Sequence, residues 1–277
     1  MERGPFSRRH DSSNGFRVTA SALFARLGVA LLVCAFTVCV AGAQGNPSAA
    51  PDTSAPLVTR DPATLSFPNH YWTAEIRANL SILEIFRSDW DKRLKLDAPP
   101  SGQATIDEIR HLHSLMALRD ERREEIKLQA DQPFIPYFFP TVMMHQWSHP
   151  RTHELMNVAY GLGPLVVPFK DRFKRARPSQ LSPTLAPMIL VPGHPAYPSG
   201  HGFQSWLIAL MTAEVRPDAR SALFAMAQRI GMNREIAGVH YPSDTKAGQI
   251  LAEQVFEIAK QGKQFQELLI QAKAEWR

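Results

Sequence analysis

The chain has 277 residues, of which 44% are hydrophobic and 21% are charged, so it can bury a substantial core and does not have a disordered composition. Its net charge of +5 is unevenly placed, because five of its 31 Lys and Arg residues and two of its 26 Asp and Glu residues fall within residues 1–43. The 26 basic and 24 acidic residues that remain give a charge of +2, which argues against nucleic-acid binding.

Residues 1–43 have the pattern of a secretory signal peptide. An Arg-rich stretch ends at Arg26, a mostly apolar run covers 27–40, and residues 41–43 form a small-x-small cleavage pattern. This run is shorter than the roughly 20 residues that a membrane span needs, and an uncleaved anchor is the alternative. No later segment has 18 uninterrupted apolar residues. We therefore expect a periplasmic or secreted protein with no stable membrane insertion after signal cleavage.

Both cysteines, Cys34 and Cys39, lie in the apolar run of the signal. After cleavage the mature chain would contain no cysteine, and so no disulfide, thiolate nucleophile or thiolate metal site. An exported protein without cysteine is compatible with a bacterial periplasm.

The remaining chain is predicted to be a flexible segment followed by one helical domain. Residues 44–68 are rich in Pro, Ser and Ala, which predicts a flexible tether or an arm lying on the surface. In residues 69–277 apolar residues recur at helical spacing, and no hairpin dipeptide separates two runs of alternating apolar and polar residues. The fold class is therefore predicted to be all-α, a single-domain helical bundle. Helices are expected over 71–97, 105–130, 153–160, 205–214, 221–236, 245–260 and 265–276. The charge-dense second half of the 105–130 helix, 119–127, is interpreted as a solvated face.

The segment 132–150 is rich in proline and aromatic residues and is predicted to be irregular or a short helix that packs on the core. His145, His149 and His153 have a spacing that places histidines on one helix face, where they could bind zinc. Pro150 interrupts that face, and no nearby Asp completes a ligand set. The sequence therefore favours ordinary packing or a pocket rim, and no metal site is predicted.

Three short pieces between residues 170 and 244 combine cations, histidines and one carboxylate. The first contains Lys170 and Arg177, which would face one side of the molecule if the stretch between them were helical. Arg supplies a rigid fork of donors and Lys a mobile point charge, so the pair suits phosphate. A solvated basic face is the alternative for this piece.

The second piece is Ser199-Gly200-His201, which precedes an apolar helix. A Ser-Gly turn that opens a helix presents unpaired backbone N–H groups and the positive end of the helix dipole to an anion. Ser199 could equally be an ordinary N-cap.

The third piece contains Arg234, His240 and Asp244. A turn is expected at Gly238, with Ser243 as N-cap of a helix that begins at Asp244. The Asp244 carboxylate could then accept a hydrogen bond from the His240 imidazole, which would fix its tautomer and leave the other nitrogen free to attack. An acidic residue in the first turn of a helix is also ordinary structure.

Together the pieces resemble the signature of the type 2 phosphatidic acid phosphatase superfamily, which is K-x6-RP, PSGH and SR-x5-H-x3-D. The chain has KDRFKRARP at 170–178, PSGH at 198–201 and NREIAGVHYPSD at 233–244. It departs at Asn233, where the pattern usually has Ser. Over about residues 150–277, the helical body behind a signal peptide further resembles the bacterial class A nonspecific acid phosphatases, which are related to vanadium haloperoxidases.

The resemblance implies a role for each motif residue. His240 would attack phosphorus and form a phosphohistidine, Asp244 would orient it, and His201 would be the general acid. No metal or cofactor is required, and vanadate would inhibit. His194, in the loop before the second piece, could line the pocket but is treated as incidental, because a loop histidine more often is. The implied phosphate-binding residues are Lys170, Arg177, Ser199, Gly200, Arg234 and, because of its departure from the pattern, Asn233 only provisionally.

The expected function is a secreted, metal-independent phosphatase that hydrolyses small phosphate monoesters through that phosphohistidine. One alternative is a vanadium-dependent haloperoxidase, with vanadate as cofactor, although those chains are longer and have a wider gap than the 31 residues between His201 and Asn233. A lipid or diphosphate phosphatase of the same superfamily is another, and a catalytically silent anion-binding protein is a third. The oligomeric state is left open, including a homo-oligomer.

Overall fold

The structure, a computed structural model, describes residues 56–68, 71 and 90–277, all within one compact unit, Ala43–Arg277. These residues form helices and no strand, with one isolated β-bridge between Ser66 and Arg175. The predicted all-α class is confirmed. The predicted signal and most of the helix expected over 71–97 lie outside the described residues.

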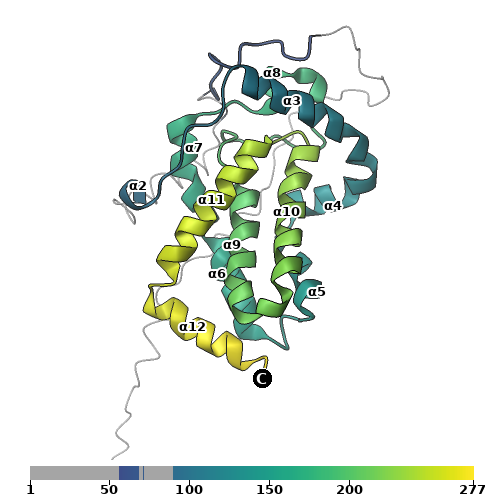
Figure 1. Ribbon diagram of the computed structural model, residues 1–277. Helices are drawn as coiled ribbons and strands as arrows, with labels where there is room; N and C mark the ends of the chain where they lie inside the picture. Colours follow the sequence, from purple (N-terminus) through teal and green to yellow (C-terminus); the bar gives the residue numbers. More distant parts are fainter. Residues whose placement is uncertain (1–55, 69–70, 72–89) are drawn as a thin grey trace, which may run out of the picture. The chain divides into compact units, whose positions relative to one another are not determined.

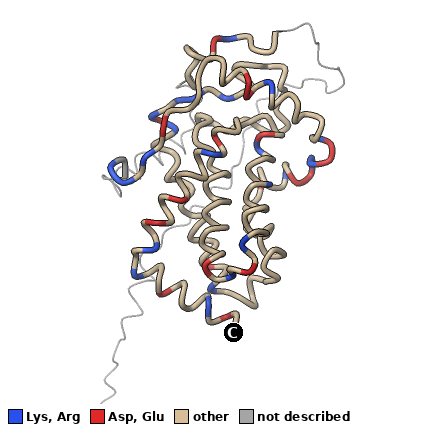
Figure 2. The backbone as a smooth tube through the Cα atoms, in the orientation of Figure 1, with Lys and Arg blue, Asp and Glu red and all other residues tan. Residues whose placement is uncertain are grey.

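The core is built around α9 (Gly200–Val215), which carries a single charged residue, Glu214, near its C-terminal end. A helix that is apolar on nearly all sides is buried by neighbours on several sides. It lies between α10 (Arg220–Ile236) and α11 (Pro242–Ala259) in Figure 1, and α6 (Pro150–Gly161) also packs against it. Figure 2 accordingly shows charged residues mainly on the surrounding segments.

The predicted helix over 105–130 is two helices, α3 (Gln103–Leu115) and α4 (Arg119–Asp131), separated by a 3-10 turn, Met116–Leu118. The prediction of one continuous helix is wrong because tertiary contacts override local propensity here. The Arg119 guanidinium donates to the carbonyl oxygens of Leu185, Ala186 and Ile236, at 2.8 to 3.0 Å. These bonds hold the start of α4 at the C-terminal end of α10.

Other helices begin at residues that the sequence analysis placed outside them. α6 and α11 start at Pro150 and Pro242, where a proline at the first helical position has no N–H to leave unpaired. The expected N-cap at Ser243 is therefore wrong, and the N-cap of α11 is Tyr241. Further helices are α2 (Trp90–Arg93), α5 (Phe139–Val142), α7 (Val167–Phe173), α8 (Pro178–Leu181) and α12 (Lys263–Ala274), and further 3-10 turns are Ile135–Phe138, Gly163–Val166, Pro183–Leu185 and Pro217–Ala219.

Residues 56–68 pack on this domain through backbone bonds. Thr59 N–H donates to the Leu181 carbonyl at 2.9 Å, and Phe67 N–H donates to the Lys174 carbonyl. The Phe67 side chain is buried in the main core. Among the described residues, no helix has the length and apolar character that a bilayer crossing demands.

Candidate active site

The three sequence pieces meet where α9 and α11 begin and α10 ends. The Ser199 backbone N–H donates to the Asp244 carbonyl at 2.9 Å, which ties the second piece directly to the third. Ser199 is also the N-cap of α9, because its hydroxyl accepts the Gly202 N–H at 3.2 Å. Close packing requires Gly248 in α11, where a Cβ atom would stand 2.5 Å from the Ser199 carbonyl oxygen. The sequence therefore brings the two helix N-termini together through backbone contact.

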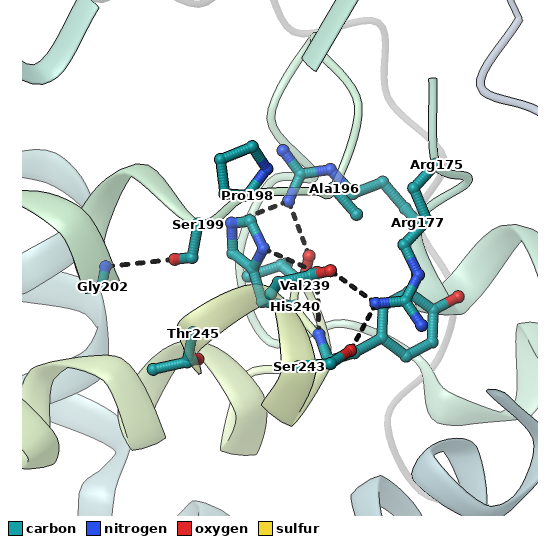
Figure 3. Close-up of polar contacts among 12 residues, drawn as sticks. Arg175, Arg177, Ala196, Pro198, Ser199, Gly202, Val239, His240, Ser243 and Thr245 are labelled. Carbon is teal, nitrogen blue, oxygen red and sulfur yellow. Dashed lines mark hydrogen bonds and ion pairs between the residues drawn. The ribbon is translucent and has the colours of Figure 1, made fainter. Parts of the chain in front are cut away.

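His240 is held between a carboxylate and a guanidinium. Its Nδ1 lies 3.0 Å from Asp244 Oδ2, and its Nε2 lies 3.0 Å from Arg177 Nη1. Arginine only donates, so Nε2 accepts, and Nδ1 carries the hydrogen that is donated to Asp244. Figure 3 shows the Arg177 side chain reaching both His240 and the Val239 carbonyl. Burial, followed by the charges of Arg177 and other cations, lowers the pKa of His240 well below its ordinary value. His240 is thus a neutral imidazole with its lone pair on Nε2.

Asp244 is fully buried and has a second charged partner that sequence reasoning missed, Arg175. Arg175 Nη1 donates to Asp244 Oδ1 at 2.6 Å and to Ser243 Oγ at 2.7 Å. Its other arm donates to Glu108 Oε2 at 2.7 Å, and its guanidinium lies 3.8 Å from the centre of the Tyr241 ring. The sequence signal that could have identified Arg175 is its position in the basic stretch between Lys170 and Arg177.

Lys170, Arg177 and Arg234 are all buried cations, with exposed fractions of 1%, 0% and 4%. Lys170 Nζ donates to three backbone carbonyls of the loop before α9, those of Pro195, Ala196 and Pro198. Burial lowers its pKa well below the usual value. The same effect lowers the pKa of Arg177 to about 9, so this guanidinium stays charged at neutral pH.

Arg234 differs from the other two cations because two of its nitrogens bond none of the residues that the structure describes. Within the described part of the chain, its buried Nε and Nη1 make no hydrogen bond. Burial lowers the pKa of Arg234 to about 10, so the side chain remains protonated near neutral pH. A buried cation with unused donors is unfavourable by itself and is matched by an anion that accepts from it.

Lys170 and Arg177 do not share a helix face. α7 ends at Phe173, Lys174 has a left-handed φ of 48°, and Arg177 lies at the start of α8. The expectation that Lys170 and Arg177 lie on one face of a single helix is therefore wrong, although both side chains reach the site. His194, which the sequence analysis treated as incidental, contacts Arg177: its carbonyl accepts from Nε at 2.9 Å, and its Nδ1 lies 3.0 Å from Nη2.

His201, in the first turn of α9, contacts α4. Its Nε2 lies 3.0 Å from the Gln129 carbonyl oxygen, and its ring centre lies 5.1 Å from that of Phe134. A carbonyl only accepts, so Nε2 carries a hydrogen, and Nδ1 makes no hydrogen bond to the described residues. Burial and then the nearby Arg234 lower the pKa of His201 well below its ordinary value, while the Gln129 carbonyl acts in the opposite direction.

The Asn233 side chain bonds residues of α4, and none of these bonds involves the site cations Lys170, Arg177 and Arg234. Its Nδ2 donates to Gln129 Oε1 at 2.8 Å and to Glu125 Oε1 at 2.9 Å, and its Oδ1 lies 3.3 Å from Arg122 Nη1. Both amide hydrogens are therefore used, and these contacts lend no support to the provisional phosphate-binding role. The interpretation of 119–127 as a solvated face holds for its other charged residues, which are exposed, but not for Arg119, Arg122 and Glu125, which turn toward the domain.

The three spaced histidines do not share a helix. His145 and His149 precede α6, and His149 stacks on Trp276 with ring centres 3.8 Å apart. Across residues 56–68, 71 and 90–277, no group of three or more His, Cys, Asp or Glu is arranged to hold a metal ion.

Residues 155–264 match the PAP2 superfamily, a range that contains all three pieces. The chain is 32% identical over 81 residues to a non-specific acid phosphatase of Providencia stuartii, covering 29% of this chain and 33% of that protein. It is 40% identical over 57 residues to an acid phosphatase of Zymomonas mobilis, covering 21% of this chain and 22% of that protein. A non-specific acid phosphatase of Salmonella typhi is 39% identical over 54 residues, with 20% and 22% coverage. The aligned part thus spans a third or less of each relative.

Proposed function

We propose that this chain, which contains a PAP2 superfamily domain at residues 155–264, is a phosphatase that hydrolyses phosphate monoesters through a phosphohistidine. The observation that carries the proposal is the buried Arg234, two of whose donors bond no described residue, in the same cluster as a neutral, carboxylate-held His240. An anion that binds Arg234 would lie beside a nucleophile whose lone pair is on Nε2, and its oxygens could replace Nε2 as acceptors from Arg177.

In the first step the phosphoryl oxygens accept from Arg177 and Arg234, and from the Ser199 hydroxyl and the Gly200 N–H at the start of α9. Arg177 Nη1 lies 3.0 Å from His240 Nε2, so a phosphoryl group at that nitrogen is within its reach. His240 Nε2 attacks phosphorus, a P–N bond forms and the P–O ester bond breaks. For this step His201 is the imidazolium, with a hydrogen on each ring nitrogen, a form that the negative charge of the bound phosphoryl group favours. It protonates the leaving oxygen from Nδ1 and becomes neutral, while its Nε2 hydrogen stays donated to the Gln129 carbonyl.

In the second step water attacks the phosphohistidine. His201 takes a proton from that water, the P–N bond breaks, and inorganic phosphate leaves with His240 restored as a neutral imidazole. Asp244 supports both steps, because its charge stabilises positive charge that develops on the ring and keeps the hydrogen on Nδ1.

The proposal includes independence of metal ions and an exported location. Lys170, Arg177 and Arg234 supply the positive charge that a phosphoryl transition state needs. Lys170 would hold the loop before α9 in position, or its ammonium group would leave the loop carbonyls and bind the phosphoryl group. The location rests on the signal pattern of residues 1–43, and the substrate class is a small phosphate ester in the periplasm or outside the cell.

Hydrolysis of an aryl phosphate by the purified protein in the presence of EDTA tests this function. We expect turnover that EDTA leaves unchanged and that vanadate, a mimic of the transferring group, blocks. His240→Ala should reduce kcat by at least about 10³-fold, since it removes the nucleophile. Turnover that EDTA abolishes, or that survives in His240→Ala, would contradict the proposal.

A further inference from the structure

We propose that Gln129 and Asn233 form a positioning pair, which holds the general acid His201 in place from α4. The inference rests on the proposed function, because it assigns the means by which the acid of that reaction is oriented. Neither residue is expected to touch the substrate. They act through hydrogen bonds to His201 and to each other.

Gln129 makes both contacts that the pair requires. Its backbone carbonyl accepts from His201 Nε2 at 3.0 Å, and its side-chain Oε1 accepts from Asn233 Nδ2 at 2.8 Å. Its exposed fraction is 1%, so solvent does not compete for either bond. An anchored side chain limits the movement of the same residue's carbonyl, and therefore of the imidazole bonded to it.

Asn233 is anchored in turn by charged groups of α4 and α10. It donates its second amide hydrogen to Glu125 Oε1 at 2.9 Å. Arg229 Nε lies 2.8 Å and 3.0 Å from the two oxygens of the same carboxylate. This ion pair keeps Glu125 in position as an acceptor. The chain of bonds thus runs from Arg229 through Glu125 to Asn233 and Gln129, which also donates from Nε2 to Glu125 Oε1 at 3.0 Å, and from Gln129 to His201.

The chemistry of the pair explains the departure of position 233 from serine. A serine hydroxyl donates one hydrogen, whereas the asparagine amide donates two and can bind Gln129 and Glu125 together. Both of these acceptors belong to α4, which lies outside the residues that match the PAP2 superfamily. The acid is therefore positioned by a helix that lies outside the residues that match the superfamily.

The dependence of rate on the leaving group distinguishes acid positioning from a general structural role. An alkoxide leaving group needs its proton in the transition state, whereas p-nitrophenolate leaves with little help. Asn233→Ser should therefore lower kcat/KM for an alkyl phosphate roughly tenfold or more, and for p-nitrophenyl phosphate about twofold or less. Gln129→Ala keeps the carbonyl but removes the anchor, so it should show the same selectivity.

The matched control is Glu124→Gln in the same helix, because Glu124 is exposed and pairs only with Lys127 among the contacts described. It should leave both rates unchanged. In a His201→Ala background, Asn233→Ser should cause no further selective loss, since the group that it positions is gone. The thermal midpoint of each variant shows whether it is folded.

Equal losses on the two esters in both folded variants would overturn the inference and leave the phosphatase function standing. A selective loss that persists in the His201→Ala background would also overturn it. If the unaltered protein hydrolyses neither ester, the proposed function fails and the inference fails with it.

Discussion

At the scale of single residues, the orientation of His240 depends on a carboxylate that is itself held by a second cation. Asp244 Oδ2 accepts from His240 Nδ1 and from the Tyr241 N–H, and Oδ1 accepts from Arg175. Each oxygen therefore has a defined partner, so the imidazole has one favoured orientation. Arg175 also bonds Glu108 of α3, which links His240, the proposed nucleophile, to a helix far away in the sequence.

Replacing Arg175 by Gln should lower kcat roughly 100-fold and change KM little, because Arg175 orients Asp244 and does not contact the phosphoryl group. It should also destabilise the fold by about 3 kcal/mol, since the buried Asp244 charge loses a partner. Arg175→Lys keeps the charge and should recover part of both losses. Steady-state kinetics and denaturant unfolding measure the two effects. A folded Arg175→Gln protein with unchanged kcat would contradict this role.

Glu235, in the last turn of α10, is a buried carboxyl whose Oε1 accepts from the Thr245 hydroxyl at 2.6 Å. Burial raises the pKa of Glu235 from 4.5 to about 7. Between these values the folded state binds more protons than the unfolded state, so the contribution of Glu235 to stability falls as pH rises through 7.

Glu235→Gln stays neutral at every pH and can still accept from Thr245. Above about pH 8 the variant should be more stable than the unaltered protein, by up to about 3 kcal/mol. Below about pH 4 both side chains are neutral in both states, so this advantage should disappear. Thermal unfolding at the two pH values measures the difference. An advantage of the same size at both would show that ionisation of Glu235 is not its cause.

At the scale of elements, the site depends on how closely α11 approaches the start of α9. At Gly248, an added Cβ would meet backbone atoms, 2.5 Å from the Ser199 carbonyl oxygen and 2.7 Å from the Phe203 nitrogen. Backbone atoms cannot turn aside as a flexible side chain can, so the two helices would have to separate.

Gly248→Ala should therefore destabilise the fold by about 1–3 kcal/mol. It should also lower kcat by up to roughly 100-fold, because it moves Ser199 and His201 relative to His240. Gly161, in α6, is the matched control, since a Cβ there meets no atom within 4 Å. Gly161→Ala should leave the rate unchanged. If Gly248→Ala and Gly161→Ala had the same stability and the same kcat, this would contradict the importance of the helix contact at Gly248.

At the scale of the whole molecule, apolar residues at helical spacing were enough to predict the helical class. The order and spacing of the three pieces were enough to predict that His240, Asp244 and the cations lie together. Arg175 was missed because an arginine within a basic run has the same local pattern as a solvated one. Gln129 and Glu125 were missed because their bonds to His201 and Asn233 join residues 72 and 108 positions apart. The break at Met116–Leu118 was missed because Arg119 secures it through distant carbonyls.

The domain that matches the PAP2 superfamily is therefore not the whole of the site. Glu108 in α3 and Gln129 in α4 precede residues 155–264, yet they bond Arg175 and His201. We infer that α3 and α4 stabilise the geometry of the proposed site through these bonds.

The most direct test of the account is capture of the phosphorylated enzyme. The purified protein would be mixed with p-nitrophenyl phosphate, denatured rapidly during turnover without acid, and analysed by mass spectrometry of the intact chain and its peptides. We predict one added phosphoryl group, located on His240 and absent from His240→Ala. A phosphoryl group on another residue, or turnover retained by His240→Ala, would contradict the account.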